Sequence, residues 1–352
     1  MERIKNVIKD ITGIDPIIIK NTQVRLDNLT KPLGSLGRLE EMAKQICGIT
    51  GKANPSLMNK VIFTLAADHG VTDEGVSAYP KEVTAQMVYN FIAGGAGINV
   101  LAKHVGARVV VADIGVAADL KPDSKLRIKK INYGTKNMAK GPAMTRDEAI
   151  KAVHAGIDLF EEEFRRGIDI VGTGEMGIGN TTSASAITAS FTGASVEEIT
   201  GRGAGLDDRG LKNKVEVIKR SLSVNKPDPA DPFDVLSKVG GFEIAGLVGI
   251  ILAAASKKIP VVIDGFISGA AALVVFKIEP RVKEYMIAAH KSQEGGHKII
   301  LEHIGLRPLL DLDLRLGEGT GGALGIGLAD AAIKILTQMA TFKSANVSEK
   351  NI

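Results

Sequence analysis

The chain has 352 residues, 45% of them hydrophobic and 24% charged, which is the composition of an ordinary globular protein. Its formal net charge of +4 is spread along the sequence without a basic tail or an Arg-rich stripe. This argues against nucleic acid as a partner, because binding to a phosphate backbone needs clustered Lys and Arg. The single cysteine, Cys47, excludes an intramolecular disulfide and a metal cage made only of cysteines.

The apolar pattern does not indicate a membrane protein. The longest apolar run, Ile244–Ala255, is well short of the ~20 residues that span a bilayer. The first residues carry alternating charges and no apolar signal region. We therefore expect a soluble, cytoplasmic protein with no membrane partner.

Both ends of the sequence have helical patterns. Apolar residues recur at helical spacing near the N-terminus in Ile4–Ile11, Ile17–Leu29 and Leu36–Ile49. A further helical stretch, Gly325–Phe342, lies near the C-terminus. We expect the two ends to pack together as a small helical domain, residues 1–50 plus 325–352, beside a larger domain, residues 51–324.

Between these ends, short β-rich runs alternate with helical segments. The apolar runs are Val61–Ala67, Arg108–Ala112, Ile168–Val171, Pro260–Ile263 and Tyr285–Ala289. Continuous apolar runs separated by helical patterns indicate buried parallel strands in β-α units. Aromatic residues are only 4% of the chain, so its core must be built from aliphatic residues, Ala and Gly, as in such sheets. We therefore predict an α/β fold with a parallel sheet flanked by helices.

Polar residues follow the predicted strands where they end. Asp68 and His69 follow the first strand, Asp113 the second, Asp264 the fourth and His290 the fifth. Each one alone could merely end its strand or cap the next helix. Ligands of open parallel sheets bind outside the carboxyl ends of the strands, so together these residues favour a single binding crevice.

A glycine-rich segment, Gly172–Thr182, follows the third predicted strand and opens a helix. Backbone amides and a helix N-terminus form a natural cradle for a phosphate. Asn180 stands where a nucleoside-triphosphate loop needs its Lys, and Glu175 adds a negative charge. The segment therefore suits a monophosphate better than a pyrophosphate chain, and Glu175 would be free to accept hydrogen bonds from ribose hydroxyls.

Two other interpretations of this segment stay open. Gly172, Gly174 and Gly177 match the G-x-G-x-x-G fingerprint of dinucleotide-binding enzymes, which would make the chain an NAD-dependent oxidoreductase. The match is weak, because no strand precedes Glu197 and Glu198, the acidic residues at about the required separation. Alternatively, the glycines only allow a helix to pack closely on a strand.

Two more segments could carry chemistry. The loop Gly201–Gly205, followed by Lys212 and Lys214, offers backbone amides and cations to an anion, although such lysines are usually solvated. Near the C-terminus, Glu318 is flanked by glycines and follows the alternating leucines of Leu310–Leu316, which indicate an extended edge. A Glu in a glycine loop is usually a turn residue, but desolvation by a flat ligand would raise its pKa toward the range of a general base.

Short motifs spread from about residue 25 to about residue 330 occur together in a fixed order. They are Leu29–Glu40, Ala67–Val71, Glu74–Val76, Pro80–Thr84, Gly174–Thr182, Lys238–Phe242, Asp264–Ser268 and Arg315–Gly321. Each motif is modestly specific, and the ordered set is very specific. In this set the chain resembles the nicotinate-nucleotide:dimethylbenzimidazole phosphoribosyltransferase family.

The resemblance implies a Rossmann-like parallel sheet, a small helical domain made from both chain ends, and a homodimer. It implies that nicotinate mononucleotide and 5,6-dimethylbenzimidazole react to give α-ribazole 5′-phosphate and nicotinate, a step that builds the lower nucleotide loop of cobalamin. The partners are then small-molecule substrates, and the reaction requires neither a metal nor a cofactor. A non-catalytic nucleotide-binding protein that kept the fold is a further alternative.

The resemblance also assigns the site residues. Glu318 is implied as the general base. The residues implied around the ribose phosphate are Glu175, Gly177, Asn180, Gly203, Lys214 and Ser292, and those of the base pocket are Tyr79, Met87 and Leu316. Tyr79 and Met87 depart from the family pattern, since some members have a small hydroxyl residue and a glutamine there. The accepted base could therefore differ from dimethylbenzimidazole, and purines or other benzimidazoles are candidates.

Overall fold

The computed structural model describes residues 1–348 and contains a six-stranded sheet in the order β3-β2-β1-β4-β5-β6. The strands are β1 Lys60–Ala67, β2 Ala107–Gly115, β3 Leu126–Ile128, β4 Ile170–Met176, β5 Val261–Ile263 and β6 Met286–Ala288. Every neighbouring pair is parallel, so the carboxyl ends of all strands lie along one edge of the sheet. The predicted α/β fold with a parallel sheet is confirmed.

The structure corrects two details of the predicted strands. β4 does not end at Val171 but continues to Met176, so Gly172, Gly174 and Glu175 belong to the strand and not to a loop after it. Glycines weaken an isolated strand, but this one pairs along its whole length with β1. The short strand β3 was not predicted, because only its first residue is buried and it therefore lacks an apolar run.

Helices connect the strands and cover both faces of the sheet. The α-helices are α1 Glu2–Lys9, α2 Pro16–Asp27, α3 Arg38–Thr50, α4 Val83–Ala93, α5 Gly97–Val105, α6 Arg146–Phe164, α7 Asn180–Thr192, α8 Val196–Ile199, α9 Asp208–Asn225, α10 Pro232–Val239, α11 Phe242–Ser256, α12 Phe266–Ile278, α13 Gly295–Ile304, α14 Thr320–Gln338 and α15 Phe342–Ala345. Two 3-10 helices are η1 Gly70–Glu74 and η2 Pro280–Tyr285. Polar side chains cap the start of several helices. At the start of α2, the Asp15 side chain accepts a hydrogen bond from the amide of Ile17.

Side chains of β1 alternate between two apolar cores, one on each face of the sheet. Val61, Phe63 and Leu65 belong to one core, whereas Ile62 and Ala66 belong to the other. This alternation follows from the pleat of a strand, in which successive side chains point to opposite faces. All five side chains are buried, so neither face of the strand is left to solvent.

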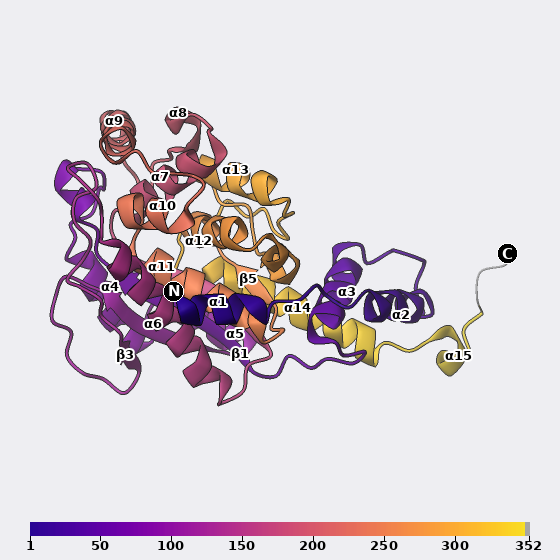
Figure 1. Cartoon of the computed structure of the whole chain (residues 1–352). Helices are drawn as coiled ribbons and strands as arrows, with labels where there is room; N and C mark the ends of the chain where they lie inside the picture. The colour runs from indigo at the N-terminus through magenta and orange to yellow at the C-terminus, as the bar shows by residue number, and fades with distance from the viewer. Residues whose placement is uncertain (349–352) are drawn as a thin grey trace.

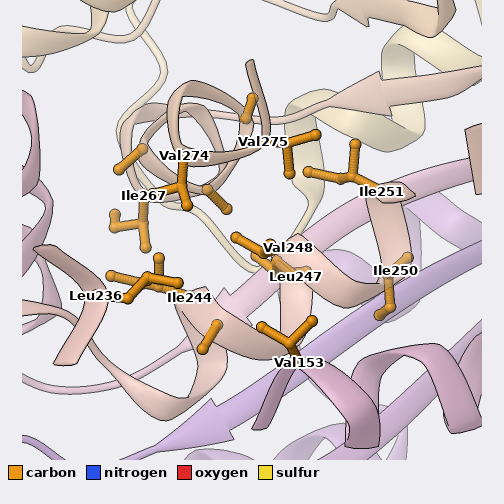
Figure 2. Packing of buried hydrophobic residues seen from close by; sticks show 14 of the residues in the cluster. Val153, Leu236, Ile244, Leu247, Val248, Ile250, Ile251, Ile267, Val274 and Val275 are labelled. Carbon is orange, nitrogen blue, oxygen red and sulfur yellow. The ribbon is translucent and has the colours of Figure 1, made fainter. Parts of the chain in front are cut away.

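The first core lies under α6, α11 and α12. Figure 2 shows Val248 of α11 between Val153 of α6 and Val274 of α12. α6 and α11 approach each other closely, since a Cβ atom added to Gly156 of α6 would lie 1.9 Å from the carbonyl oxygen of Gly246. Any side chain at Gly156 would therefore push these two helices apart.

The second core lies under α14, which packs on β4 and β5 with α3 and α5 beside it. Among residues 1–348, α14 is the one helix that is long and apolar enough to cross a membrane by length and composition. Its residues Ala323, Ile326, Ala329 and Ile333 are buried against the sheet and the neighbouring helices. Here α14 is a core helix.

Two helices from the N-terminal part of the chain, α2 and α3, lie beside the far end of α14 (Figure 1). α2 packs on α3, α3 packs on α14, and the amide of Thr30 donates a 3.0 Å hydrogen bond to the carbonyl of Ala340. α1 instead packs on α11 over the larger part of the molecule (Figure 1). The domain boundaries expected after residue 50 and before residue 325 stay a prediction.

Candidate active site

The carboxyl ends of the central strands border a cavity of about 670 Å³. Its lining includes the following residues that the sequence analysis assigned to the site: Tyr79, Met87, Glu175, Gly177, Asn180, Gly203, Ser292, Leu316 and Glu318. Lys214 is fully buried behind the wall, where its Nζ donates a 2.7 Å hydrogen bond to Oγ1 of Thr181, a lining residue. The structure thus brings all the assigned residues to one place.

Not every polar residue at a strand end reaches this cavity. Asp113 accepts a 2.8 Å hydrogen bond from the amide of Val116 and pairs with Lys130 at 3.1 Å. Asp68 accepts a 2.8 Å hydrogen bond from the amide of Ala117. Both side chains therefore fix the turn after β2, and the expectation that they join the crevice is wrong.

The loop that carries Glu318 has an unusual backbone. The φ angles of Gly317, Glu318 and Gly319 are +80°, +62° and +100°. Glycine adopts such angles freely, but a glutamate there stores about 1 kcal/mol of strain or more. Oγ1 of Thr64 holds the loop by donating a 2.9 Å hydrogen bond to the carbonyl of Glu318, and a Cβ atom on Gly174 would lie 2.3 Å from that carbonyl oxygen. The loop can therefore lie against β4 only because residue 174 is glycine.

The Glu318 carboxyl is 5% exposed and lines the cavity. Burial raises its pKa above the ordinary value, the hydrogen bond from the amide of Ile98 lowers it, and the charge of Asp264 raises it again. The net shift is upward, which makes Glu318 a stronger base than an exposed glutamate. Its position and basicity suit it to accept a proton from a ligand in the cavity.

Asp264, the residue after β5, holds the start of α14. Its carboxylate accepts hydrogen bonds from the amides of Gly319 at 3.2 Å and Gly322 at 2.9 Å. A carboxylate at a helix N-terminus satisfies free amides and complements the helix dipole. Nε2 of His290 lies 3.7 Å from the same carboxylate and also lines the cavity. Asp264 explains why α14 begins at Thr320 and not at Gly325, where helical periodicity alone placed it.

Glu175 is nearly inaccessible and lies close to other carboxylates. Burial raises its pKa to about 8, with further contributions from Glu243 and Asp264 that outweigh the hydrogen bond from the Asn180 amide. At neutral pH its carboxyl group is therefore mostly protonated, and it can donate a hydrogen bond as well as accept one. That Glu175 accepts hydrogen bonds from ribose hydroxyls stays a prediction, and the sequence did not show the neighbouring acids that raise its pKa.

The turn between β4 and α7 forms one side of the cavity. Gly179, with φ +90°, precedes α7, whose N-terminus has no side-chain cap and opens toward the cavity lining. A Cβ atom on Gly177 would lie 2.4 Å from the carbonyl oxygen of Ala67. Gly172 lies inside β4, against Ile62 of β1. Packing therefore accounts for the fingerprint glycines, and the geometry disfavours the dinucleotide interpretation.

The loop Gly201–Gly205 lies beside this turn, since a Cβ atom on Gly203 would lie 3.0 Å from Oγ1 of Thr181. Buried Lys214 donates to Oγ1 of Thr181 at 2.7 Å and to the carbonyl of Gly201 at 3.2 Å. Burial lowers its pKa to about 8, although the charge of Glu294 opposes the shift. At neutral pH Lys214 is thus mostly a cation, and with the Thr181 hydroxyl and the Gly203 amide it forms a donor set suited to an anion.

Ser292 is positioned by a buried histidine. Its amide donates a 3.1 Å hydrogen bond to Nδ1 of His297. Burial, with the nearby His290, lowers the pKa of His297 to about 3, so that its ring is neutral and Nδ1 can accept this bond. The sequence did not single out His297, because a lone histidine inside a helix is usually a core residue.

The assigned base-pocket residues lie at the open end of the cavity. Tyr79 is 53% exposed and Leu316 is 60% exposed, whereas Met87 is half-buried. Sequence reasoning missed the apolar lining residues Val76, Val83, Met176, Phe266 and Ile267. All of them lie inside the quoted motifs, but nothing in their residue types separates them from core positions.

A buried polar network behind the Gly177 turn was also missed. Nε2 of His69 lies 2.7 Å from Oε1 of Glu243, and its Nδ1 lies 3.1 Å from Oγ of Ser183. These contacts join the segment that follows β1 to α11 and α7, so they hold that segment against the two helices. Within residues 1–348, no group of three or more His, Cys, Asp or Glu side chains is placed to hold a metal ion.

Comparisons with known proteins agree with this geometry. A phosphoribosyltransferase family model matches residues 11–347. Nicotinate-nucleotide–dimethylbenzimidazole phosphoribosyltransferases from Geobacter sulfurreducens and Desulforudis audaxviator are each 56% identical over 349 residues, which is 99% of both chains. The solved structure of the enzyme of that name from Thermus thermophilus has a TM-score of 0.91 at 43% identity, covering 96% of this chain and 100% of the other. The chain therefore belongs to the nicotinate-nucleotide–dimethylbenzimidazole phosphoribosyltransferase family.

Proposed function

We propose that this enzyme transfers the ribose 5-phosphate of nicotinate mononucleotide to 5,6-dimethylbenzimidazole or a related base. The products are α-ribazole 5′-phosphate and nicotinate, and the step belongs to cobalamin biosynthesis. One observation carries the proposal: the cavity has a buried carboxyl group of raised pKa, Glu318, on one wall and an anion-binding donor set backed by Lys214 on another.

The donor nucleotide activates its own leaving group. The pyridinium nitrogen of nicotinate mononucleotide is positive, so nicotinate leaves with a neutral ring nitrogen and needs no acid. The transition state has oxocarbenium character at the ribose carbon. The incoming base attacks from the opposite face and inverts the β linkage to α. The protein therefore needs mainly to position two substrates and to remove one proton.

Glu318 supplies that proton acceptor. When one nitrogen of a benzimidazole forms the new bond to ribose, its other ring nitrogen becomes acidic. A carboxylate within hydrogen-bond reach then takes the proton. The Ile98 amide and Thr64 hydroxyl hold the carboxyl and the backbone of Glu318, so the base is oriented before substrate binds.

The end of the cavity that takes the phosphate offers neutral hydrogen-bond donors and the buried cation Lys214. Gly203 and Gly177 contribute backbone that a ligand can approach closely, and Ser292 contributes a hydroxyl. Lys214 supplies positive charge from behind Thr181. The mostly protonated Glu175 lies between the two ends, where it suits the ribose hydroxyls because it can donate without repelling the phosphate.

The side chains at the open end of the cavity determine which base the enzyme prefers. Tyr79 places an aromatic ring and Met87 a thioether where some family members carry smaller or amide side chains. Both changes alter the shape and the hydrogen bonding of the pocket. We propose that the enzyme accepts bases beyond 5,6-dimethylbenzimidazole.

We further propose a homodimer, a cytoplasmic location, and division into a small domain, residues 1–50 plus 325–352, and a catalytic domain, residues 51–324. The homodimer is what the resemblance to the family implies. Sedimentation equilibrium tests the dimer: a monomer at micromolar concentration contradicts it.

A product assay tests the reaction itself. Purified protein with nicotinate mononucleotide and 5,6-dimethylbenzimidazole should release nicotinate and form α-ribazole 5′-phosphate. Binding of the mononucleotide without nicotinate release would instead indicate a nucleotide-binding protein. Binding of NADH in place of the mononucleotide would indicate an oxidoreductase.

A further inference from the structure

Glu294 has a side chain that the proposed reaction does not use. It precedes α13 but does not cap that helix. Instead its Oε1 accepts a 2.9 Å hydrogen bond from the amide of Gly203, and the residue is only 6% exposed. Among residues 1–348, its second oxygen, Oε2, has no hydrogen-bond partner. A buried carboxylate thus lies in the cavity wall with half of its hydrogen-bonding capacity unused.

The position of this carboxylate is defined by the anion-binding donors around it. A Cβ atom on Gly203 would lie 3.0 Å from Oγ1 of Thr181 and 3.3 Å from Nζ of Lys214. The amide, the hydroxyl and the ammonium therefore converge on one small region. Glu294 already accepts the hydrogen bond of the Gly203 amide in that region, and its negative charge raises the pKa of Lys214.

A phosphate and the Glu294 carboxylate cannot share this region at low cost. Both are anions, and the described cations beside Gly203 are Lys214, behind Thr181, and Arg315, whose Nη1 donates a 3.2 Å hydrogen bond to the Gly203 carbonyl. Repulsion between two charges in a partly desolvated wall is much stronger than in water. An arriving phosphate must therefore displace Glu294 from the Gly203 amide. The N-terminus of α13, which has no side-chain cap, offers the displaced carboxylate a new position.

We propose that Glu294 limits the affinity of this region for phosphate, because its carboxylate competes with a bound phosphate for the Gly203 amide. This rests on the proposed function, which places the phosphate of the mononucleotide at Gly203 and Lys214. A free inorganic phosphate must displace the carboxylate with its own contacts alone. The mononucleotide meets the same displacement free energy, and its ribose and base contacts offset it.

Calorimetric titration with inorganic phosphate tests this proposal without depending on turnover. The variants are Glu294→Gln, which keeps the shape and removes the charge, and Glu294→Ala, which removes the side chain. Glu302→Gln is the matched control, because Glu302 lies on the same helix with a 66% exposed side chain. Both Glu294 variants should bind phosphate about tenfold more tightly or better, and the control should match wild type.

The same phosphate titration can also contradict the proposal. Phosphate affinity that is unchanged, absent or weaker in Glu294→Gln would overturn the proposal and assign Glu294 to support of the Gly203 loop or of the charge on Lys214. The KM for nicotinate mononucleotide gives a second readout. It should fall by a similar factor, because the same displacement free energy is removed for both ligands. Failure of the proposed function is separate, because it appears as missing product in the wild-type enzyme.

Discussion

The amide of Ile98 donates a 3.0 Å hydrogen bond to Oε2 of Glu318, which lies 220 residues further along the chain. Ile98 belongs to the first turn of α5, where the amides of a helix carry partial positive charge. This contact favours the carboxylate form, whereas burial and Asp264 favour the protonated form. The basicity of Glu318 is thus a balance between a helix end and a buried site.

Replacing Glu318 by Gln should remove the base and keep the fold. Glutamine retains an oxygen for the Ile98 amide but cannot take a proton from the attacking azole. We expect kcat to fall by about 10²- to 10⁴-fold, while the Kd of nicotinate mononucleotide changes little. Steady-state kinetics with calorimetry measures both, and Glu302→Gln is the control. Wild-type turnover in Glu318→Gln would refute the assignment.

The pH dependence of kcat/KM should reflect the raised pKa of Glu318. The base acts when deprotonated, so activity is present above its pKa and is lost as the pH falls through it. Because that pKa is raised, the loss should begin at a higher pH than for an ordinary glutamate. Asp264→Asn removes a charge that raises this pKa and should move the acid limb to lower pH. An unmoved limb in Asp264→Asn would show that the charge of Asp264 has no influence on the base.

Gly174→Ala should displace the catalytic loop. The new Cβ atom would lie 2.3 Å from the carbonyl oxygen of Glu318, so the loop must move away from β4. We expect a loss of about 1–3 kcal/mol in the free energy of unfolding and a fall in kcat. Gly141→Ala is the control, because a Cβ atom there meets nothing within 4 Å. Denaturant unfolding and kinetics should separate the two variants, and equal behaviour would contradict the close approach.

Glu175→Gln should change how stability depends on pH. The folded pKa of Glu175 is about 8, above the unfolded value of 4.5, so between these values the folded protein holds a proton that the unfolded chain lacks. Wild-type stability from this group therefore declines as the pH rises through that window. The neutral amide avoids the loss, and the variant should gain about 1 kcal/mol or more relative to wild type between pH 5 and pH 8. Denaturation curves at pH 5 and pH 8 measure the free energy of unfolding of the variant and the wild type, with Glu302→Gln as control. A difference between variant and wild type that is the same at both pH values would contradict the raised pKa.

Tyr79→Ser and Met87→Gln should alter the choice of base and leave the nucleotide end intact. The smaller Ser opens the pocket and Gln adds a hydrogen-bonding amide, so kcat/KM ratios within a panel of benzimidazoles and purines should shift by about tenfold. The KM for nicotinate mononucleotide should stay close to wild type. Competition assays with paired bases measure the ratios. An unchanged order of preference would place the base elsewhere in the cavity.

The sequence predicted the fold well where a continuous apolar run marked the element. Buried parallel strands such as Val61–Ala67 have continuous apolar runs, and the structure reproduces this one within a residue. β4 was cut short at Val171, because its glycines resemble a loop until the pairing with β1 is known. The start of α14 was also misplaced, since it depends on the distant Asp264 and not on local periodicity.

The site was predictable only in part, and the roles of its residues stay predictions. The glycine-flanked Glu318 has a local pattern, and the motif set placed the other residues that the structure gathers around the cavity. His297 and Glu243 have no such pattern. Their importance depends on burial and on partners far away in the chain, which a single sequence does not show.

The hydrogen bond between Thr30 and Ala340 has a consequence for synthesis of the chain. α2 and α3 are translated long before α14, yet the buried side chains of Leu26, Leu29 and Ile46 share one core with Leu336. A nascent chain therefore carries an uncovered apolar surface on α2 and α3 until α14 has been made. Premature termination before residue 336 would leave that surface exposed, and quality-control proteases could distinguish such fragments from the finished enzyme.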